Sequence, residues 1–216
     1  MTGDFNRDSI ARAYARWAPV YDRVFGKVFE RGRSAAIAAV EAAVPQGGRL
    51  LEVGVGTGIS LPSYRRDIRI VGLDISAPML KRAQQRVAEL NLTNVEALSV
   101  MDAAKLALPD ASFDAVVAQY VITAVPDPDG TLDEFARVVK PGGEIILVNH
   151  IGAEKGSRAV FEAGFAPIAR RLGWRPEFKF GRLSSWASRH GGVRLIERRA
   201  MPPMGHFSLI RFGRLP

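Results

Sequence analysis

Glu52 and three glycines have the types and the spacing of a turn that binds a nucleoside. Glu52 lies in a short apolar run that begins at Arg49, and Gly54, Gly56 and Gly58 follow at alternate positions. Such a run is typical of a strand buried in a parallel sheet. Glycines at its end let the backbone turn sharply and approach a ligand closely. The pattern therefore predicts a buried strand followed by a ligand-binding loop.

Asp74 follows a second apolar run, residues 68–73. In open α/β sheets, ligands bind beyond the carboxyl ends of the strands. An ionised carboxylate only accepts hydrogen bonds, so Asp74 there suits the two hydroxyl groups of a ribose. We expect the chain to hold a nucleoside.

The glycine spacing excludes two other nucleotide-binding loops. In the dinucleotide fingerprint G-x-G-x-x-G, a register starting at Gly54 would place the third glycine at Ile59, and one starting at Gly56 would place it at Leu61. Neither position is glycine. The Lys-Ser/Thr pair of a phosphate-binding P-loop is absent too, as expected for a ligand without phosphate.

The Glu-x-Gly-x-Gly-x-Gly spacing, with Asp74 at the next strand end, resembles motif I of the class I S-adenosylmethionine-dependent methyltransferases. The resemblance implies S-adenosylmethionine as cofactor and S-adenosylhomocysteine as product. It also implies a Rossmann-like α/β fold, with a seven-stranded, mostly parallel sheet, an antiparallel last strand and helices on both faces. The cofactor-binding residues that it implies are Tyr14, Glu52, Gly54, Gly56, Gly58, Asp74, Ile75, Met79, Met101, Asp102, Ala103 and Gln119.

Further segments fall where this family would place them. The resemblance covers residues 45–150 closely and the rest more loosely. Expected strands are residues 95–100, 113–118 and 144–148, and expected helices are residues 132–139, 155–172 and 184–190. A turn at residues 140–143 precedes the fifth strand, and residues 193–200 and 206–212 are expected to form a closing antiparallel hairpin.

The length of the chain indicates one α/β domain, residues 1–216, and the resemblance implies that it is a methyltransferase domain. We divide it into an N-terminal segment (1–33), a cofactor-binding core (45–150) and basic C-terminal elements (151–216). The sequence has no cysteine, which excludes disulfides and thiolate metal sites. No His/Asp/Glu grouping has metal-ligand spacing, so no metal is expected. No signal peptide or membrane-spanning run is visible, which favours a cytoplasmic protein.

Positive charge is concentrated at the two ends of the chain. The net charge of +8 comprises +3 in residues 1–33, −5 in residues 34–154 and +10 in residues 155–216. Basic ends around an acidic core indicate an anionic partner, either nucleic acid or a lipid surface. An arginine-rich surface that serves only solubility is the alternative.

The first thirty residues favour a lipid surface. On a helix, apolar side chains share one face and basic side chains share the opposite face, which is typical of an interfacial membrane helix. The apolar face holds Ile10, Tyr14, Trp17, Tyr21, Phe25 and Val28, and the basic face holds Arg12, Arg16, Arg23 and Lys27. Pro19 is expected to kink this segment. A lid that packs on the protein core would show the same pattern.

The stretch from Tyr14 to Asp22 resembles two groups of methyltransferases. One group comprises the bacterial phospholipid N-methyltransferases, which convert phosphatidylethanolamine stepwise to phosphatidylcholine. The other comprises the ubiquinone/menaquinone-biosynthesis C-methyltransferases. Four features favour the phospholipid enzyme: the sequence of residues 20–26, the short chain, the basic tail, and Asn149-His150 after the fifth strand.

That choice implies a phospholipid substrate and peripheral attachment to the anionic inner face of the cytoplasmic membrane. It implies neither nucleic acid nor an obligate protein partner. The quinone enzyme remains the alternative. A nucleic-acid methyltransferase ranks last, because the Asp/Asn-Pro-Pro-aromatic motif expected after the fourth strand is replaced by residues 118–121.

Methylation of an amine requires a neutral nitrogen, because a protonated amine cannot attack. Tyr21, His150 and Asn149 are the candidate catalytic residues. The resemblance implies that Tyr21 closes over the cofactor, and the ordinary pKa of histidine suits His150 to proton relay. For each of the three, packing or a structural hydrogen bond is the alternative role.

Overall fold

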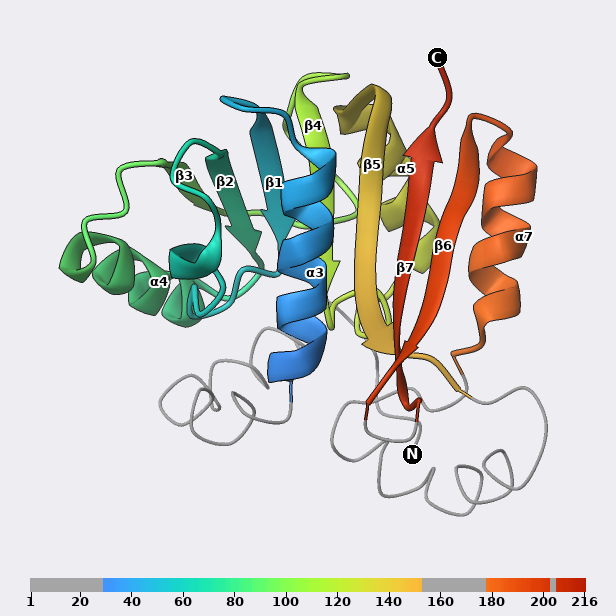
Figure 1. Ribbon diagram of the computed structural model, residues 1–216, viewed down its shortest axis with the longest axis horizontal. Coiled ribbons are helices and arrows are strands. Elements are labelled where there is room, and N and C mark those ends of the chain that lie inside the picture. Colours follow the sequence, from blue (N-terminus) through green and yellow to red (C-terminus); the bar gives the residue numbers. More distant parts are fainter. Residues whose placement is uncertain (1–28, 153–177, 203–204) are drawn as a thin grey trace.

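The computed structural model describes residues 29–152, 178–202 and 205–216. Its centre is a seven-stranded sheet with strand order β3-β2-β1-β4-β5-β7-β6 (Figure 1). The elements are α3 (Glu30–Ala43), β1 (Arg49–Val53), the 3-10 turn η1 (Leu61–Ser63), β2 (Arg69–Asp74), α4 (Ala77–Glu89), β3 (Val95–Val100), β4 (Phe113–Gln119), α5 (Pro128–Val138), β5 (Val139–His150), α7 (Phe180–His190), β6 (Val193–Met201) and β7 (Phe207–Arg214).

The strand directions confirm the expected fold class. Strands β1 to β5 run parallel to one another. Strand β7 runs antiparallel to both β5 and β6, which gives the predicted closing hairpin. Strands β2 and β3 are added on one side of β1, and the chain then crosses to place β4 on the other side of β1. A ligand crevice is therefore expected at the carboxyl ends of β1 and β4, where the winding reverses.

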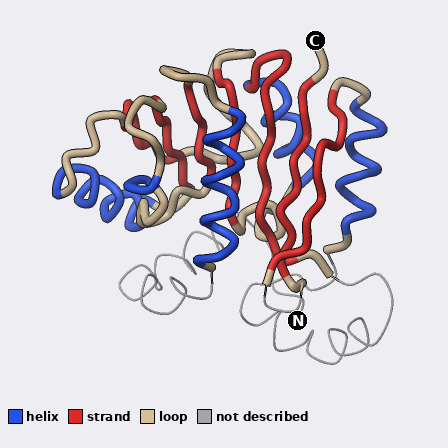
Figure 2. The backbone as a smooth tube through the Cα atoms, in the orientation of Figure 1, coloured by secondary structure: helices blue, strands red, loops and turns tan. Residues whose placement is uncertain are grey.

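Helices cover both faces of the sheet, as Figure 2 shows. Because successive strand residues point to opposite faces, β1 contributes Leu50 to one apolar core and Leu51 to the other. The Leu50 core includes residues of α3 and α4, and the Leu51 core includes residues of α5 and α7. Both cores pack against the sheet and support it beneath its loops.

Three element boundaries differ from those expected. Helix α5 begins four residues early, because the Asp127 side chain accepts a hydrogen bond from Gly130 N at 3.0 Å and Pro128 suits a first turn. The expected turn at residues 140–143 is a bulge inside β5, since pairing passes from Phe113–Val139 to Ala115–Glu144. Helix α7 also begins earlier, at Phe180.

Two predicted segments lie outside the described residues, namely the N-terminal amphipathic segment up to residue 28 and the helix at residues 155–172. Across the described ranges, no helix is both long enough and apolar enough to cross a bilayer.

Candidate active site

A cavity opens beside the carboxyl ends of β1, β2 and β4. Ten of the twelve predicted cofactor-binding residues lie in its wall: Glu52, Gly54, Gly56, Asp74, Ile75, Met79, Met101, Asp102, Ala103 and Gln119. Tyr14 lies outside the described residues. Gly58 is described but is not part of the wall. Residues from four separate strand ends therefore meet where the sheet topology places a ligand.

The glycine loop after β1 is tied to the end of β2. The N–H groups of Gly54 and Val55 both donate to the Leu73 carbonyl, at 2.7 and 2.9 Å. Gly54 has a φ of +71°, and a Cβ atom there would lie 2.2 Å from Val121 Cγ2. Only glycine satisfies both the left-handed backbone and this close approach.

Gly58 has a packing role instead of a place in the wall. Its φ is +73°, and a Cβ atom there would lie 2.9 Å from Leu61 Cδ1 and 3.1 Å from Ala83 Cβ. The glycine lets α4 pack closely against the loop. From the same helix, Arg86 Nη1 donates to the Thr57 carbonyl at 2.6 Å.

Asp74 is prepared to accept hydrogen bonds from a ligand. Its Oδ2 accepts from Gly56 N at 2.9 Å, and its Oδ1 accepts from Ser76 N at 2.8 Å. These bonds fix the carboxylate and leave acceptor capacity on each oxygen. Burial raises the pKa of the Asp74 carboxyl, while the backbone donors act in the opposite direction.

Glu52 lies deeper and has one unsatisfied oxygen. Its Oε1 accepts from Ser60 Oγ at 2.6 Å and from Gln119 Nε2 at 3.1 Å. Its Oε2 is buried and has no hydrogen-bond partner within the described structure. Burial raises the pKa of Glu52 from 4.5 to about 7. A buried acceptor without a donor, in a cavity wall, fits a cationic ligand group.

The segment after β3 forms a further side of the cavity. Met101 N donates to the Asp74 carbonyl at 3.0 Å. Asp102 Oδ1 accepts from Ala104 N at 3.0 Å, which shapes the turn. Met101, Asp102 and Ala103 thereby face the same cavity as the glycine loop.

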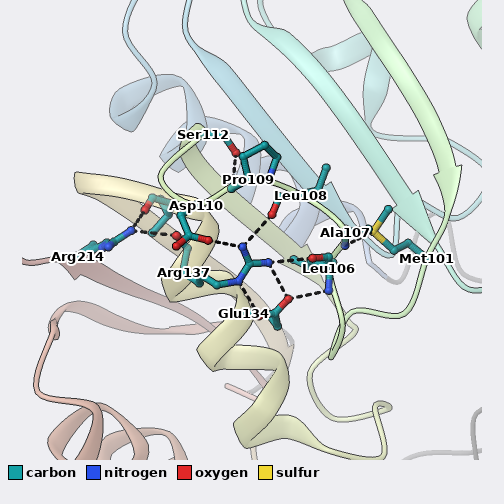
Figure 3. A network of polar contacts seen from close by, with 11 residues as sticks. Met101, Leu106, Ala107, Leu108, Pro109, Asp110, Ser112, Glu134, Arg137 and Arg214 are labelled. Atoms are coloured by element: carbon teal, nitrogen blue, oxygen red, sulfur yellow. Dashed lines mark hydrogen bonds and ion pairs between the residues drawn. The ribbon is translucent and has the colours of Figure 1, made fainter.

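The loop that continues from this turn is held from behind by α5 (Figure 3). Arg137 donates to the carbonyls of Leu106 and Leu108 at 2.9 and 2.8 Å. It also pairs with both carboxylate oxygens of Glu134, at 2.7 and 2.8 Å. Glu134 in turn accepts from Leu106 N at 2.7 Å. Neither charged side chain lies in the cavity wall, yet both fix the loop that does.

Phe29, Arg33 and Tyr120 also lie in the wall, and none of them is among the twelve predicted cofactor-binding residues. The rings of Phe29 and Tyr120 stack with their centroids 4.0 Å apart. Arg33 is the one cation in the described part of the wall, and its charge opposes the rise in the pKa of Glu52. No local pattern marks Phe29 or Arg33, because α3 reaches the cavity only by packing across β4 and β5.

The predicted catalytic residues Asn149 and His150 lie next to the cavity but outside its wall. Asn149 is fully buried, and its Oδ1 accepts from Thr123 Oγ1 at 3.5 Å. His150 stacks on His206, with ring centroids 6.1 Å apart. As successive residues of a strand, the two side chains point to opposite faces of the sheet. Tyr21 lies outside the described residues.

Comparison with known proteins identifies the family. A family described as a methyltransferase domain matches residues 51–147. The chain is also 42% identical to the phosphatidylethanolamine N-methyltransferase of Cereibacter sphaeroides, over 96% of this chain and 98% of that protein. The chain belongs to the S-adenosylmethionine-dependent methyltransferases.

Two further comparisons agree with this family. The methyltransferase is 34% identical to the demethylmenaquinone methyltransferase of Deinococcus radiodurans, over 76% of this chain and 70% of that protein. Its fold matches a SAM-dependent methyltransferase of Thermotoga maritima with a TM-score of 0.68 and 23% identity, over 94% of this chain and 99% of that one.

The cofactor of the methyltransferase is S-adenosylmethionine, and the cavity wall suits its parts. Asp74 can accept from the ribose hydroxyls, and Asp102 can accept from the adenine amino group. The unsatisfied Oε2 of Glu52 suits the ammonium of the methionine end, and Arg33 suits its carboxylate.

Proposed function

We propose that this methyltransferase transfers methyl groups to the amino nitrogen of phosphatidylethanolamine, stepwise toward phosphatidylcholine. The observation that carries the proposal is the 42% identity to the Cereibacter sphaeroides protein that bears this name. The match extends over 96% of the chain, well beyond the methyltransferase-domain match at residues 51–147. It therefore includes the flanking segments, in which acceptor specificity is expected to reside.

S-adenosylmethionine supplies a methyl group on a positively charged sulfur. The wall of the cavity can then favour transfer by lowering the pKa of the acceptor amine. An alkyl amine with a lysine-like pKa of about 10.4 is almost wholly protonated at neutral pH. Val121, Val125 and Pro126 provide an apolar surface beside the cofactor residues. Removal from water and a neighbouring positive charge both disfavour the ammonium form.

We propose that the predicted catalytic residues remove the proton from the acceptor amine and organise the site. His150 is separated from the wall residue Tyr120 by the ring of Phe207, whose centroid lies 6.3 Å from His150 and 5.5 Å from Tyr120. We propose that His150 relays the proton away from the site. Asn149 acts through Thr123 on the loop after β4, and Tyr21 closes over the cofactor.

We further propose that the basic face of residues 1–33 binds the anionic inner leaflet, with residues 45–150 as the cofactor-binding core and residues 151–216 on the substrate side. A water-insoluble lipid substrate requires the enzyme to work at a surface. The opposed apolar and basic faces of the N-terminal segment support this arrangement.

The test is methyl transfer from labelled S-adenosylmethionine to vesicles that contain phosphatidylethanolamine and an anionic lipid. Mass spectrometry should find the monomethyl lipid first and then the dimethyl and trimethyl lipids. Demethylmenaquinone in the same vesicles serves as the competing acceptor, since a quinone enzyme also matches the chain at 34% identity. If labelled methyl groups appeared on the quinone and not on the lipid, the protein would instead be a quinone-biosynthesis methyltransferase.

A further inference from the structure

Tyr120 has a backbone conformation that tyrosine rarely adopts. It follows β4 directly, its φ is +62°, and its side chain lies in the cavity wall. Its N–H donates to the Val148 carbonyl at 2.6 Å, which fixes this conformation against β5. Non-glycine residues in the left-handed region are uncommon, and they cluster at functional sites. The conformation therefore calls for a functional explanation.

The hydroxyl of Tyr120 joins the end of β4 to the start of α3. Tyr120 Oη donates to the Phe29 carbonyl at 3.2 Å. The same carbonyl accepts from Arg33 N at 2.9 Å. One oxygen atom thus links Tyr120 to the helical turn that carries Arg33 into the cavity wall.

Gly32 makes this contact possible. A Cβ atom at Gly32 would lie 2.1 Å from Tyr120 Oη and 2.9 Å from Val148 Cγ1. Any larger residue at this position would have to displace the hydroxyl. The left-handed backbone, the hydrogen bond and the glycine therefore all serve a single contact between β4 and α3.

We propose that Tyr120 is a positioning residue for the methionine end of S-adenosylmethionine. By holding the Phe29 carbonyl, its hydroxyl fixes the first turn of α3, and this turn keeps Arg33 where it can pair with the cofactor carboxylate. The strained backbone at residue 120 is what directs the ring toward α3. The proposal does not depend on the identity of the methyl acceptor.

The test compares two ligands that differ only at the end where Arg33 acts. S-adenosylhomocysteine carries the amino and carboxyl groups, whereas 5′-methylthioadenosine has the same adenosine and thioether without them. Tyr120→Phe removes the hydroxyl and keeps the stacked ring. Calorimetry should find affinity for S-adenosylhomocysteine weakened about fivefold, as for one lost hydrogen bond, and affinity for 5′-methylthioadenosine unchanged.

Thr131→Val is the matched control, because it removes another hydroxyl bonded to a backbone carbonyl. Thr131 Oγ1 donates to the Asp127 carbonyl at 2.7 Å in α5 and lies outside the cavity wall. This variant should lower the melting temperature and leave both affinities unchanged. A purely structural role for Tyr120 would give the same result as the control and would overturn the proposal.

Gly32→Ala tests the contact from the other side. It should weaken S-adenosylhomocysteine selectively, as Tyr120→Phe does. In the double variant the nearest clashing atom is gone, so the combined loss should be smaller than the two losses multiplied. Equal weakening of the two ligands by either single variant, or independent effects in the double variant, would refute the positioning role.

Discussion

Two buried carboxylates in one cavity wall differ in how many donors they already have. Asp74 holds a backbone N–H on each oxygen, at 2.8 and 2.9 Å. Glu52 holds its donors on one oxygen only, and burial raises its pKa to about 7. Asp74 is therefore suited to neutral hydroxyl donors, whereas the unpartnered oxygen of Glu52 is suited to a cationic donor, which would further stabilise the ionised form.

Asp74→Ala should abolish tight cofactor binding. Two hydrogen bonds from ribose hydroxyls to a charged group, at about 1.5–3 kcal/mol each, correspond to a loss of at least about 100-fold in affinity. Calorimetry with S-adenosylhomocysteine measures this loss, and Asp74→Asn should give a smaller one, since the amide keeps one acceptor oxygen. An unchanged affinity in Asp74→Ala would refute the assigned cofactor site.

Cofactor affinity should depend on pH through Glu52. The free carboxyl has a pKa of about 7, and a bound ammonium lowers it, so binding releases a proton below pH 7. Affinity should therefore rise with pH by up to about tenfold per unit and level off near pH 7. Glu52→Gln should weaken binding and remove this slope. Measurements should stay below about pH 7.5, where the α-amino group of the ligand is still protonated.

Glu52 should also make the cofactor-free protein less stable as pH rises. The folded protein holds the Glu52 proton more tightly than the unfolded chain, with a pKa of about 7 against an ordinary 4.5. Stability from this group is complete below pH 4.5 and falls until about pH 7, by on the order of 3 kcal/mol. Glu52→Gln should therefore raise the melting temperature at pH 8 but not at pH 4. A lower melting temperature at pH 8 would contradict the burial argument.

At the scale of elements, α5 supports the loop that follows the wall residues Met101, Asp102 and Ala103. Glu134 accepts from the Leu106 N–H and Arg137 donates to the Leu106 carbonyl, and the two side chains also pair with each other. Within this loop, Ala107 N donates a hydrogen bond to Met101 Sδ at 3.3 Å. The position of Met101 and Asp102 is therefore set from a helix that does not touch the ligand cavity.

Arg137→Gln should weaken cofactor binding and leave the maximal rate intact. Loss of the clamp loosens the loop, so the Michaelis constant for S-adenosylmethionine should rise about tenfold, while turnover at saturation changes little. Arg211→Gln is the control. Its pair with Glu144, at 2.8 Å, is likewise bidentate and has side chains 20% and 15% exposed, against 30% and 21% for Arg137 and Glu134. Equal effects of the two variants on the Michaelis constant would contradict a role of Arg137 in holding this loop.

At the scale of the whole molecule, the acidic segment and the basic ends have different tasks. Residues 34–154 carry a net charge of −5 and hold most of the cavity wall, as suits a cationic cofactor. The ends carry +3 and +10. In the described part of the C-terminal region, Arg182 and Arg189 both pair with Asp129, so some of that basic charge stabilises the fold. For the N-terminal charges, our proposal is that they bind an anionic lipid surface.

Replacing Arg12, Arg16, Arg23 and Lys27 with glutamine should weaken binding to anionic vesicles. Each basic residue near an anionic leaflet contributes about 1 kcal/mol, so the partition coefficient should fall by two to three orders of magnitude. Vesicle co-sedimentation measures this, and calorimetry with S-adenosylhomocysteine checks that the cofactor site is intact. Unchanged partitioning would show that these charges do not bind the membrane.

Most of the cofactor site could be predicted from local sequence, because each of its parts lies at the end of a strand. Glu52, Asp74 and Asp102 follow or close recognisable apolar runs, and strand ends converge in a parallel sheet. Arg33, and the contact that Tyr120 makes with α3, could not be found in this way. Their roles depend on α3 crossing β4 and β5, a contact between residues about ninety positions apart in sequence.

The amino-acid order by itself determined the nucleoside class of ligand, through the glycine spacing and Asp74, and these same residues carry the family resemblance that implied the sheet and its closing hairpin. Tertiary structure alone decided which neighbours share a site. It separated Asn149 from His150 onto opposite faces, gave Gly58 a packing role and left Glu52 Oε2 without a donor. Burial and hydrogen bonding arise between elements distant in the chain, so no local pattern contains them.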